Sequence, residues 1–358
     1  MEIEIELSDL LVKNFSKYAN HIVYERAIPL LNDGLKPVQR RVLLSMNNLG
    51  LNNNKPFKKA AKVIGDTVGQ YHPHSLDGPY GALVNMTATF SARYPLGDGS
   101  GNFGSIENDP PAAMRYVESR LSKTGDLLLG DTNEATVPWM PTYDNEGLEP
   151  KYLGGFFPNI LCNYTNGIAA GVSSMIPSHN ATEVITALIK TIDQVNKGKD
   201  INTKFLMKYI KGPDFPTEGI IMNPEDIESV YDNGKGKFVI RGQYTIKNKK
   251  ELVFTSIPYT TNVSVIMSGL KKLRENKLCG EFKNFSAKGV LNISIKPARG
   301  QSVDDLIKQV FKKTKLEDSF NSIFTIIHND KVIEHMPLVS IVKKLLIHYH
   351  NIVKNKLT

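Results

Sequence analysis

The 358-residue sequence has few cysteines, no long apolar run and no basic N-terminus, and each absence excludes a class of protein. Its 2 cysteines, Cys162 and Cys279, are too few and too far apart in sequence for a disulfide framework or a zinc knuckle. No apolar run approaches the ~18 residues of a membrane-spanning helix. The first six residues alternate glutamate with apolar side chains and lack the basic start of a signal peptide. We therefore expect a soluble protein in a reducing compartment.

Positive charge, by contrast, is abundant and concentrated near the N-terminus. The formal net charge is +8. Between residues 26 and 62, eight basic residues and one acid, Asp33, leave a local charge of +7. The basic residues are Arg26, Lys36, Arg40, Arg41, Lys55, Lys58, Lys59 and Lys62. Such a field suits a polyanion, and neutralising phosphates would make binding strongly salt-dependent. A solvated lysine-rich surface without a ligand is the alternative.

The first part of the chain predicts a mainly helical domain with a helix-turn-helix. Apolar residues recur at helical spacing over 8–28, from Pro37 to about residue 49, over 57–70 and from Pro79 to about residue 90. The third of these helices would direct three lysines outward: Lys58, Lys59 and Lys62. Two helices joined by a tight turn beside a basic surface are typical of a DNA-binding helix-turn-helix.

From about residue 145 the pattern becomes mixed and predicts a second, α+β domain. Strand-like runs occur at 237–241, 243–247, 251–256, 289–296 and 323–328. Residues 248–250 and 329–330 read as hairpin turns, and 181–196 and 303–315 as helices. After Pro337 an amphipathic helix runs over 338–357 without a cap, so we expect it to continue in a longer protein.

Residues 110–121 predict a short helix that carries an uncommitted tyrosine. Asp109 can cap this helix, and two prolines suit its first turn. Its apolar stripe would consist of Met114, Val117 and Leu121. Tyr116 lies roughly 110° from the centre of that stripe, beside Arg115. This layout suits covalent attack on a phosphodiester, although most of the 14 tyrosines must be packing residues.

Three further motifs allow more than one interpretation. Residues 99–104 spell Gly-x-Gly-x-x-Gly, but they follow a predicted helix and open none, so we expect a close backbone turn rather than a dinucleotide site. His72 and His74 flank a proline without a third ligand for zinc, which leaves turn packing, phosphate contact or proton transfer. The adjacent Arg40 and Arg41 favour phosphate.

Together these segments resemble the A subunit of bacterial type IIA DNA topoisomerases, meaning gyrase and topoisomerase IV, over essentially the whole chain. The matching stretches are Arg26-Ala-Ile-Pro29, Asp33-Gly-Leu-Lys-Pro-Val-Gln-Arg-Arg41, Tyr71-His-Pro-His74, Gly101-Asn-Phe-Gly-Ser105, Ala112-Ala-Met-Arg-Tyr116, Asn166-Gly-Ile-Ala169, Gly212-Pro-Asp-Phe-Pro-Thr217 and Ile257-Pro-Tyr259. Gln39 and Asp109-Pro-Pro111 look more like topoisomerase IV, whereas Gly101-Asn-Phe-Gly104 is nearer gyrase.

The resemblance implies a domain order and an assembly. It implies an N-terminal helical arm over 1–28, a winged-helix DNA-cleavage domain over 29–150, a tower domain over 151–336 and the start of a coiled-coil helix over 337–358. It further implies a homodimer on double-stranded DNA, together with a separate B subunit that binds both Mg²⁺ and ATP. The location would be the cytoplasm of a bacterium, or of the host cell for a viral relative.

The resemblance also implies residue roles. Tyr116 would attack a DNA phosphate and become joined to the 5′ end of the broken strand, within a cluster that includes Arg115, His74 and Arg41. A phenol with a pKa near 10 needs its developing charge stabilised, which the adjacent arginine can do. Lys36, Arg40 and His72 would hold DNA, in addition to the three lysines of the predicted third helix. Ile168 matches the residue that wedges between base pairs.

Departures from the family pattern qualify these expectations. Asn32 stands where the family usually has an arginine. Asp77 and Gly81 occupy the quinolone-contacting positions, usually a small hydroxyl residue and an acid, so weak drug contact is expected. The wrapping domain of gyrase is absent from this chain, which favours relaxation or decatenation over supercoiling. The alternative function is a DNA-binding scaffold that has lost cleavage.

Overall fold

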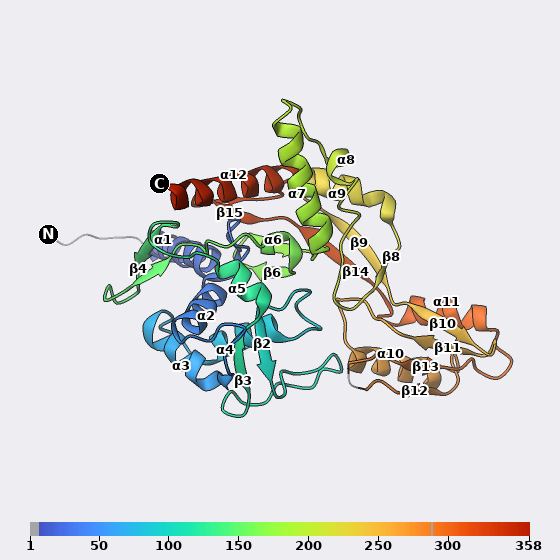
Figure 1. Cartoon of the computed structure of the whole chain (residues 1–358). Helices are drawn as coiled ribbons and strands as arrows, with labels where there is room; N and C mark the ends of the chain where they lie inside the picture. Colours follow the sequence, from blue (N-terminus) through green and yellow to red (C-terminus); the bar gives the residue numbers. More distant parts are fainter. Residues whose placement is uncertain (1–6, 288) are drawn as a thin grey trace.

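The protein has an α+β fold in which the strands form antiparallel sheets, as the sequence predicted. The structure is a computed structural model that describes residues 7–287 and 289–358, so the acidic hexapeptide 1–6 lies outside the described residues. Figure 1 shows a helical group at the N-terminal end, a central sheet, and a smaller sheet flanked by two helices. Within the described ranges, no helix combines the length and the apolar character needed to cross a membrane.

The N-terminal part packs three helices against a small sheet. Its elements are α1 (Leu7–Ile22), a π-helical turn (Val23–Ala27), α2 (Pro37–Asn48), β1 (Lys58–Lys59), α3 (Ala60–Gln70), α4 (Asp77–Thr87), β2 (Gly97–Ser100), β3 (Glu118–Leu121) and α5 (Lys123–Leu129). Helices α2, α3 and α4 contact one another, and the sheet has the order β1-β3-β2. Pro37 begins α2 as predicted, and the Gln39 side chain accepts a hydrogen bond from the backbone N–H of Lys36 (3.0 Å).

The predicted helix over 110–121 is wrong. Met114–Tyr116 form a turn, and the following residues form β3, in register with β2 from Gly97↔Leu121 to Ser100↔Glu118. Val117 and Leu121 are buried as predicted, but Leu121 ends β3 and Val117 directly precedes it. A spacing of four residues fits both the helical and the strand period, and pairing with β2 decides between them. Asp109 caps no helix and instead accepts a hydrogen bond from the Ser105 hydroxyl (2.6 Å).

A five-stranded sheet forms the centre of the chain. The elements that lead to it or belong to it are β4 (Trp139–Pro141), β5 (Leu148–Pro150), α6 (Asn159–Cys162), β6 (Thr165–Ile168), β7 (Ser173–Ile176), α7 (Ala181–Val195), α8 (Thr203–Leu206), β8 (Ile220–Ile221), a 3-10 turn (Pro224–Asp226), α9 (Ile227–Asn233), β9 (Lys235–Arg241) and β14 (Glu317–Ile323). The sheet order is β6-β7-β14-β9-β8. The C-terminal helix α12 (Leu338–Leu357) contacts α7, α8 and α9.

A second hydrophobic core lies between the four-stranded sheet and two helices. This unit contains β10 (Tyr244–Lys247), β11 (Glu251–Phe254), α10 (Val263–Glu275), β12 (Phe282–Asn284), β13 (Ile293–Ile295) and α11 (Val303–Lys313). Both predicted hairpin turns are present, and each contains two residues in the left-handed region. Asn248 and Lys249 (φ 50° and 54°) precede β11. Asn329 and Asp330 (φ 49° and 56°) connect β15 (Ile326–His328) to β16 (Lys331–Ile333). The main core draws its residues from two stretches of the chain, Leu31 to Ile240 and Phe320 to Leu345, and the second core lies between them in sequence.

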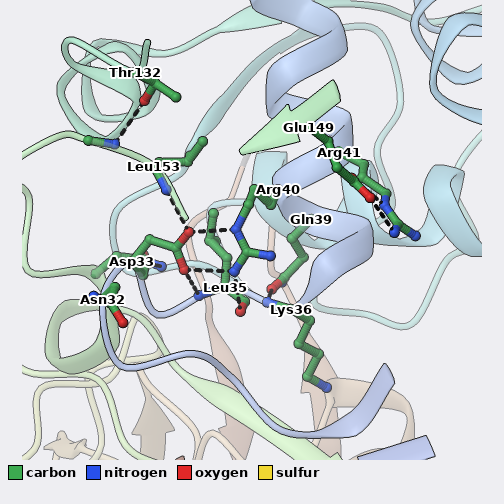
Figure 2. Close-up of polar contacts among 12 residues, drawn as sticks. Asn32, Asp33, Leu35, Lys36, Gln39, Arg40, Arg41, Thr132, Glu149 and Leu153 are labelled. Carbon is green, nitrogen blue, oxygen red and sulfur yellow. Dashed lines mark hydrogen bonds and ion pairs between the residues drawn. The ribbon is translucent and has the colours of Figure 1, made fainter. Parts of the chain in front are cut away.

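One buried ion pair joins distant parts of this main core. The carboxylate of Asp33 accepts hydrogen bonds from Arg40 Nε (2.7 Å) and Nη2 (3.0 Å), and from the backbone N–H groups of Leu35 and Leu153 (3.0 Å each), as Figure 2 shows. The Asp33 carbonyl accepts from Asn159 Nδ2 (3.0 Å). Arg40 is buried in this network, which corrects its predicted role as a DNA-contacting residue. Its guanidinium is committed to the core.

Replacing Asp33 with asparagine should lower the free energy of unfolding by about 3–5 kcal/mol, because Arg40 would remain buried without a charged partner. Urea unfolding followed by circular dichroism measures this loss. The matched control is Asp193→Asn, whose carboxylate pairs with Lys190 at the surface (3.2 Å) and should contribute less than about 1 kcal/mol. Equal losses for the two variants would contradict a structural role of the buried pair.

Candidate active site

Tyr116 lies on an exposed turn that hydrogen bonds from α3 and α4 hold in place. Its side chain is 64% exposed, and Arg115 Cζ lies 4.6 Å from the centre of its ring. The backbone N–H of Ala61 donates to the Met114 carbonyl (3.2 Å), which attaches the turn to the start of α3. The Tyr80 hydroxyl of α4 donates to the Ala112 carbonyl. The exposed phenol that the sequence predicted is present, although a strand and a turn hold it instead of a helix.

The glycine-rich stretch 99–104 packs against the segment that carries Tyr116. Gly99 lies in β2, so the stretch does not simply follow a helix, but it leads into a loop rather than opening a helix. Gly101 (φ 111°) lies so close to Val117 that an added Cβ would be 3.1 Å from its side chain. The backbone N–H of Ala112 donates to the Asn102 carbonyl (3.0 Å). The stretch therefore forms a close backbone turn beneath the Tyr116 segment.

A second group of functional candidates follows the other end of α3. Arg41 donates from Nε and Nη2 to the two carboxylate oxygens of Glu149 (2.7 Å each), and its Nη1 lies 3.3 Å from His72 Nδ1. The His72 and His74 rings meet edge-on with their centres 4.8 Å apart. Burial, then the charges of Arg41, His74 and Arg26, lowers the pKa of His72 to about 4. His72 is therefore neutral at physiological pH.

The residues predicted to contact nucleic acid differ in how far their side chains are exposed. Lys36 is half-buried, its ammonium donates to the Asn166 carbonyl, and burial lowers its pKa. Ile168 is 78% exposed at the end of β6. Its neighbour Gly167 lies against the Ala27 carbonyl, where an added Cβ would be 1.8 Å from the oxygen, so only glycine fits. This close approach fixes the hairpin that presents Ile168 to solvent.

The remaining candidates lie on the surface of the helical group. Lys58, Lys59 and Lys62 are exposed, but only Lys62 lies on α3. Lys58 and Lys59 form β1, which corrects the helix predicted from residue 57, because they pair with β3, and Lys59 also pairs with Glu118 (3.1 Å). Asp77 is exposed at the start of α4, and the open space around Gly81 would accommodate a side chain. Asn32, the departure from the family arginine, has a structural partner: its Nδ2 lies 2.9 Å from His348 Nδ1 of α12.

The structure thus forms two groups of site residues. One group is the Tyr116 turn at the start of α3, and the other is the His72 and Arg41 cluster beyond its end. Among residues 7–287 and 289–358, no hydrogen bond or ion pair connects the two groups, which lie at opposite ends of the eleven-residue helix α3, about 16 Å long. In the same ranges, no three His, Cys, Asp or Glu side chains gather as metal ligands would.

Sequence reasoning missed Glu149 and Tyr80. Glu149 pairs with Arg41 across 108 residues, and Tyr80 is one of 14 tyrosines with no distinguishing spacing. A buried acid within a short strand gives no periodic signal when the strand has only three residues. Only the tertiary contact reveals either residue.

The chain belongs to the family formed by the A subunits of DNA gyrase and topoisomerase IV, whose model matches residues 26–358. It is 39% identical, over 99% of its length, to the A subunit of DNA topoisomerase 4 from Staphylococcus epidermidis. It is 37% identical over 99% of its length to the A subunit of DNA gyrase from Kosmotoga olearia, and 36% identical over 98% to that from Thermotoga maritima. In each comparison the chain spans 44% of the relative, less than half of its length.

The lowered pKa of His72 predicts a loss of stability in acid. Because the pKa is about 4 in the folded chain and ordinarily 6.5, the unfolded chain binds a proton between these values that the folded chain does not. The stabilisation is thus complete above pH 6.5 and is lost as the pH falls towards 4. Urea unfolding at neutral pH and at pH about 5 should show a smaller loss in His72→Gln than in the wild type.

Two other buried histidines, His179 and His348, also have pKa values lowered to about 4 by burial, so the wild type and the variant both lose stability in acid. The difference between them isolates the contribution of His72. An identical loss in both proteins would show that His72 titrates normally in the folded chain.

Proposed function

We propose that this chain is the DNA cleavage and religation subunit of a type IIA topoisomerase, with Tyr116 as the nucleophile. The observation that carries the proposal is the exposed phenol stacked with Arg115 on a turn that α3 and α4 hold in place. Exposure alone does not distinguish Tyr116, since Tyr18 is equally exposed, but Tyr116 combines it with an adjacent guanidinium and a fixed backbone. The names of the relatives support the same activity.

The reaction would proceed by transesterification. The Tyr116 oxygen attacks a backbone phosphorus and gives up its proton, the bond from phosphorus to the 3′ oxygen breaks, and the 3′ oxygen takes up a proton. The 5′ end then remains bonded to the tyrosine. Because one phosphoester replaces another, the reverse attack by the 3′ hydroxyl can rejoin the strand. Arg115 would stabilise the charge that builds up on the phosphate.

The assembly we propose is a homodimer on double-stranded DNA that is completed by a B subunit. The separation of the Tyr116 turn from the His72 cluster within one chain supports a homodimer, since a second copy can supply the missing group. Each copy would cut one strand and so form a double-strand gate. Mg²⁺ and ATP are assigned to the B subunit, which ATP-driven strand passage would need. The expected location is the cytoplasm.

The DNA would lie across the helical group. We propose that α2, α3 and α4, with the β1-β3-β2 sheet, form a winged-helix domain over 29–150, that the sheets of residues 151–336 belong to a tower domain, and that α12 begins a coiled coil. The exposed Lys58, Lys59 and Lys62 would contact phosphates. Ile168, held out by the Gly167 contact, would wedge between base pairs.

Tyr116→Phe should abolish protein-linked DNA breaks, because phenylalanine keeps the stacked ring but lacks the attacking oxygen. The measurement is incubation with the B subunit, Mg²⁺ and supercoiled DNA, followed by detergent and electrophoresis. Tyr18→Phe is the matched control, since Tyr18 has nearly the same exposure (62%) and should cleave like the wild type. Breaks that persist in Tyr116→Phe would refute the assignment. Salt-dependent binding by a wild type that forms no adducts would select the scaffold alternative.

Changing Lys58, Lys59 and Lys62 together to glutamine should weaken DNA binding and its dependence on salt. The slope of log affinity against log salt should become shallower by about 2–3, since each lost phosphate contact contributes roughly 0.9. Fluorescence anisotropy on a short duplex measures the slope. The control variant changes Lys247, Lys249 and Lys250 to glutamine, an equal loss of charge beside the turn between β10 and β11. Equal changes in slope would indicate a bulk charge effect.

A further inference from the structure

A buried carboxylate holds the arginine of the histidine cluster. Glu149 is 4% exposed, and Arg41 Nε and Nη2 donate to Oε2 and Oε1 at 2.7 Å each. A fork of two parallel charge-assisted hydrogen bonds fixes the plane of a guanidinium as well as its position. Figure 2 shows this pair beside α2, separate from the Asp33 network.

The remaining nitrogen of Arg41 fixes the state of His72. Nη1 lies 3.3 Å from His72 Nδ1, and a guanidinium has no acceptor, so Nδ1 must accept. The neutral ring then carries its proton on Nε2, which makes that atom a donor. The ring also meets His74 edge-on. Glu149 thus contacts Arg41, Arg41 contacts His72, and His72 contacts His74.

Glu149 is itself held in place by the β4–β5 hairpin, in which it belongs to β5. Met140 and Glu149 are paired in register, and the backbone N–H of Thr142 donates to the Gly147 carbonyl (3.0 Å). The Tyr143 hydroxyl near the hairpin tip donates to the Gly69 carbonyl (3.4 Å), close to the end of α3. The hairpin therefore contacts both the helix that carries Arg41 and the helix that leads to His72.

We propose that Glu149 is a positioning residue for DNA cleavage, which holds Arg41 so that His72 is presented as a hydrogen-bond donor. This inference rests on the proposed function. Glu149 is buried and acts through Arg41 rather than on DNA. The other nearby carboxylate, Glu25, is exposed and lies 3.9 Å from Arg41 Nη2, so it cannot replace the buried fork.

The decisive variant is Glu149→Gln, which keeps the shape of the side chain but loses its charge and one of its two acceptors. Adduct formation in the presence of Mg²⁺ and the B subunit should slow by about 10- to 100-fold, since a shift of ~1 Å at a reacting centre has effects of that size. DNA affinity should change by less than about twofold, because the exposed lysines proposed to contact phosphates are unchanged and His72 is neutral. The matched control is Glu317→Gln, which removes the carboxylate partner of Arg241 between β9 and β14 and should cleave like the wild type.

Two further measurements separate positioning from folding. Nitrogen-15 NMR should detect the proton of His72 on Nε2 in the wild type and a mixture of the two neutral tautomers in Glu149→Gln. The double variant Glu149→Gln with Arg41→Lys should cleave no more slowly than Arg41→Lys alone, because both changes break the same chain of contacts. A merely structural role would leave the tautomer unchanged and make the two losses additive.

The possible outcomes are distinct. If the wild type forms adducts through Tyr116 and Glu149→Gln forms them as fast, the inference fails while the proposed function stands. If the wild type forms no adducts, the proposed function fails and Glu149 loses its role in cleavage with it. If Glu149→Gln does not fold, Glu149→Asp keeps the charge on a shorter side chain. Its cleavage rate should be intermediate, and a wild-type rate would overturn the inference.

Discussion

The packing of the N-terminal half depends on the hydrogen bonds that the buried carboxylate of Asp33 accepts. This carboxylate accepts from Arg40, from its own loop and from Leu153, 120 residues away in sequence, and so joins α2 to the segment that leads into the central sheet. A carboxylate buried this deeply is tolerated only when both of its oxygens accept hydrogen bonds. The surrounding donors must therefore keep these positions. Because consecutive helical residues differ by about 100°, turning Arg40 inward directs Arg41 towards Glu149. The core pair therefore sets the direction of the adjacent site residue.

The net positive charge that the site offers to DNA is smaller than the number of its basic residues, because ion pairs offset some of them. Arg40 is neutralised by Asp33, and Arg41 by Glu149, which lies outside the basic segment of the sequence. Lys36 donates to a backbone carbonyl. The local charge of +7 already subtracts Asp33, and the pairing of Arg41 with Glu149 lowers the charge left for a polyanion further. That charge is carried largely by exposed lysines around α3. Arg41 and His72 present directed hydrogen-bonding groups in a fixed geometry, which is a different contribution from the diffuse attraction of the lysines.

Much of the fold could be predicted because its signals are local. Pro37 begins α2, Asn180 caps α7 through its side chain, and a left-handed Asn starts each of the two predicted hairpin turns. The segment around Tyr116 could not be predicted, because apolar residues four positions apart suit a helix and a strand equally. The long-range pairing of β3 with β2 decided the outcome. The apolar residues Leu11 and Phe15 of α1 follow a helical period but are exposed, since periodicity does not say what a face packs against.

The sequence by itself determined the family, the α+β class, most of the helices and the identity of the exposed tyrosine beside its arginine. These follow from ordered motifs, from caps and turns, and from local periodicity. Only the tertiary structure decided which of the two adjacent arginines is buried, which acid holds the other, and how the Tyr116 turn is supported. Those outcomes depend on contacts between residues far apart in sequence, such as Tyr80 with Ala112 (32 positions) and Arg41 with Glu149 (108 positions), for which a single sequence contains no local signal.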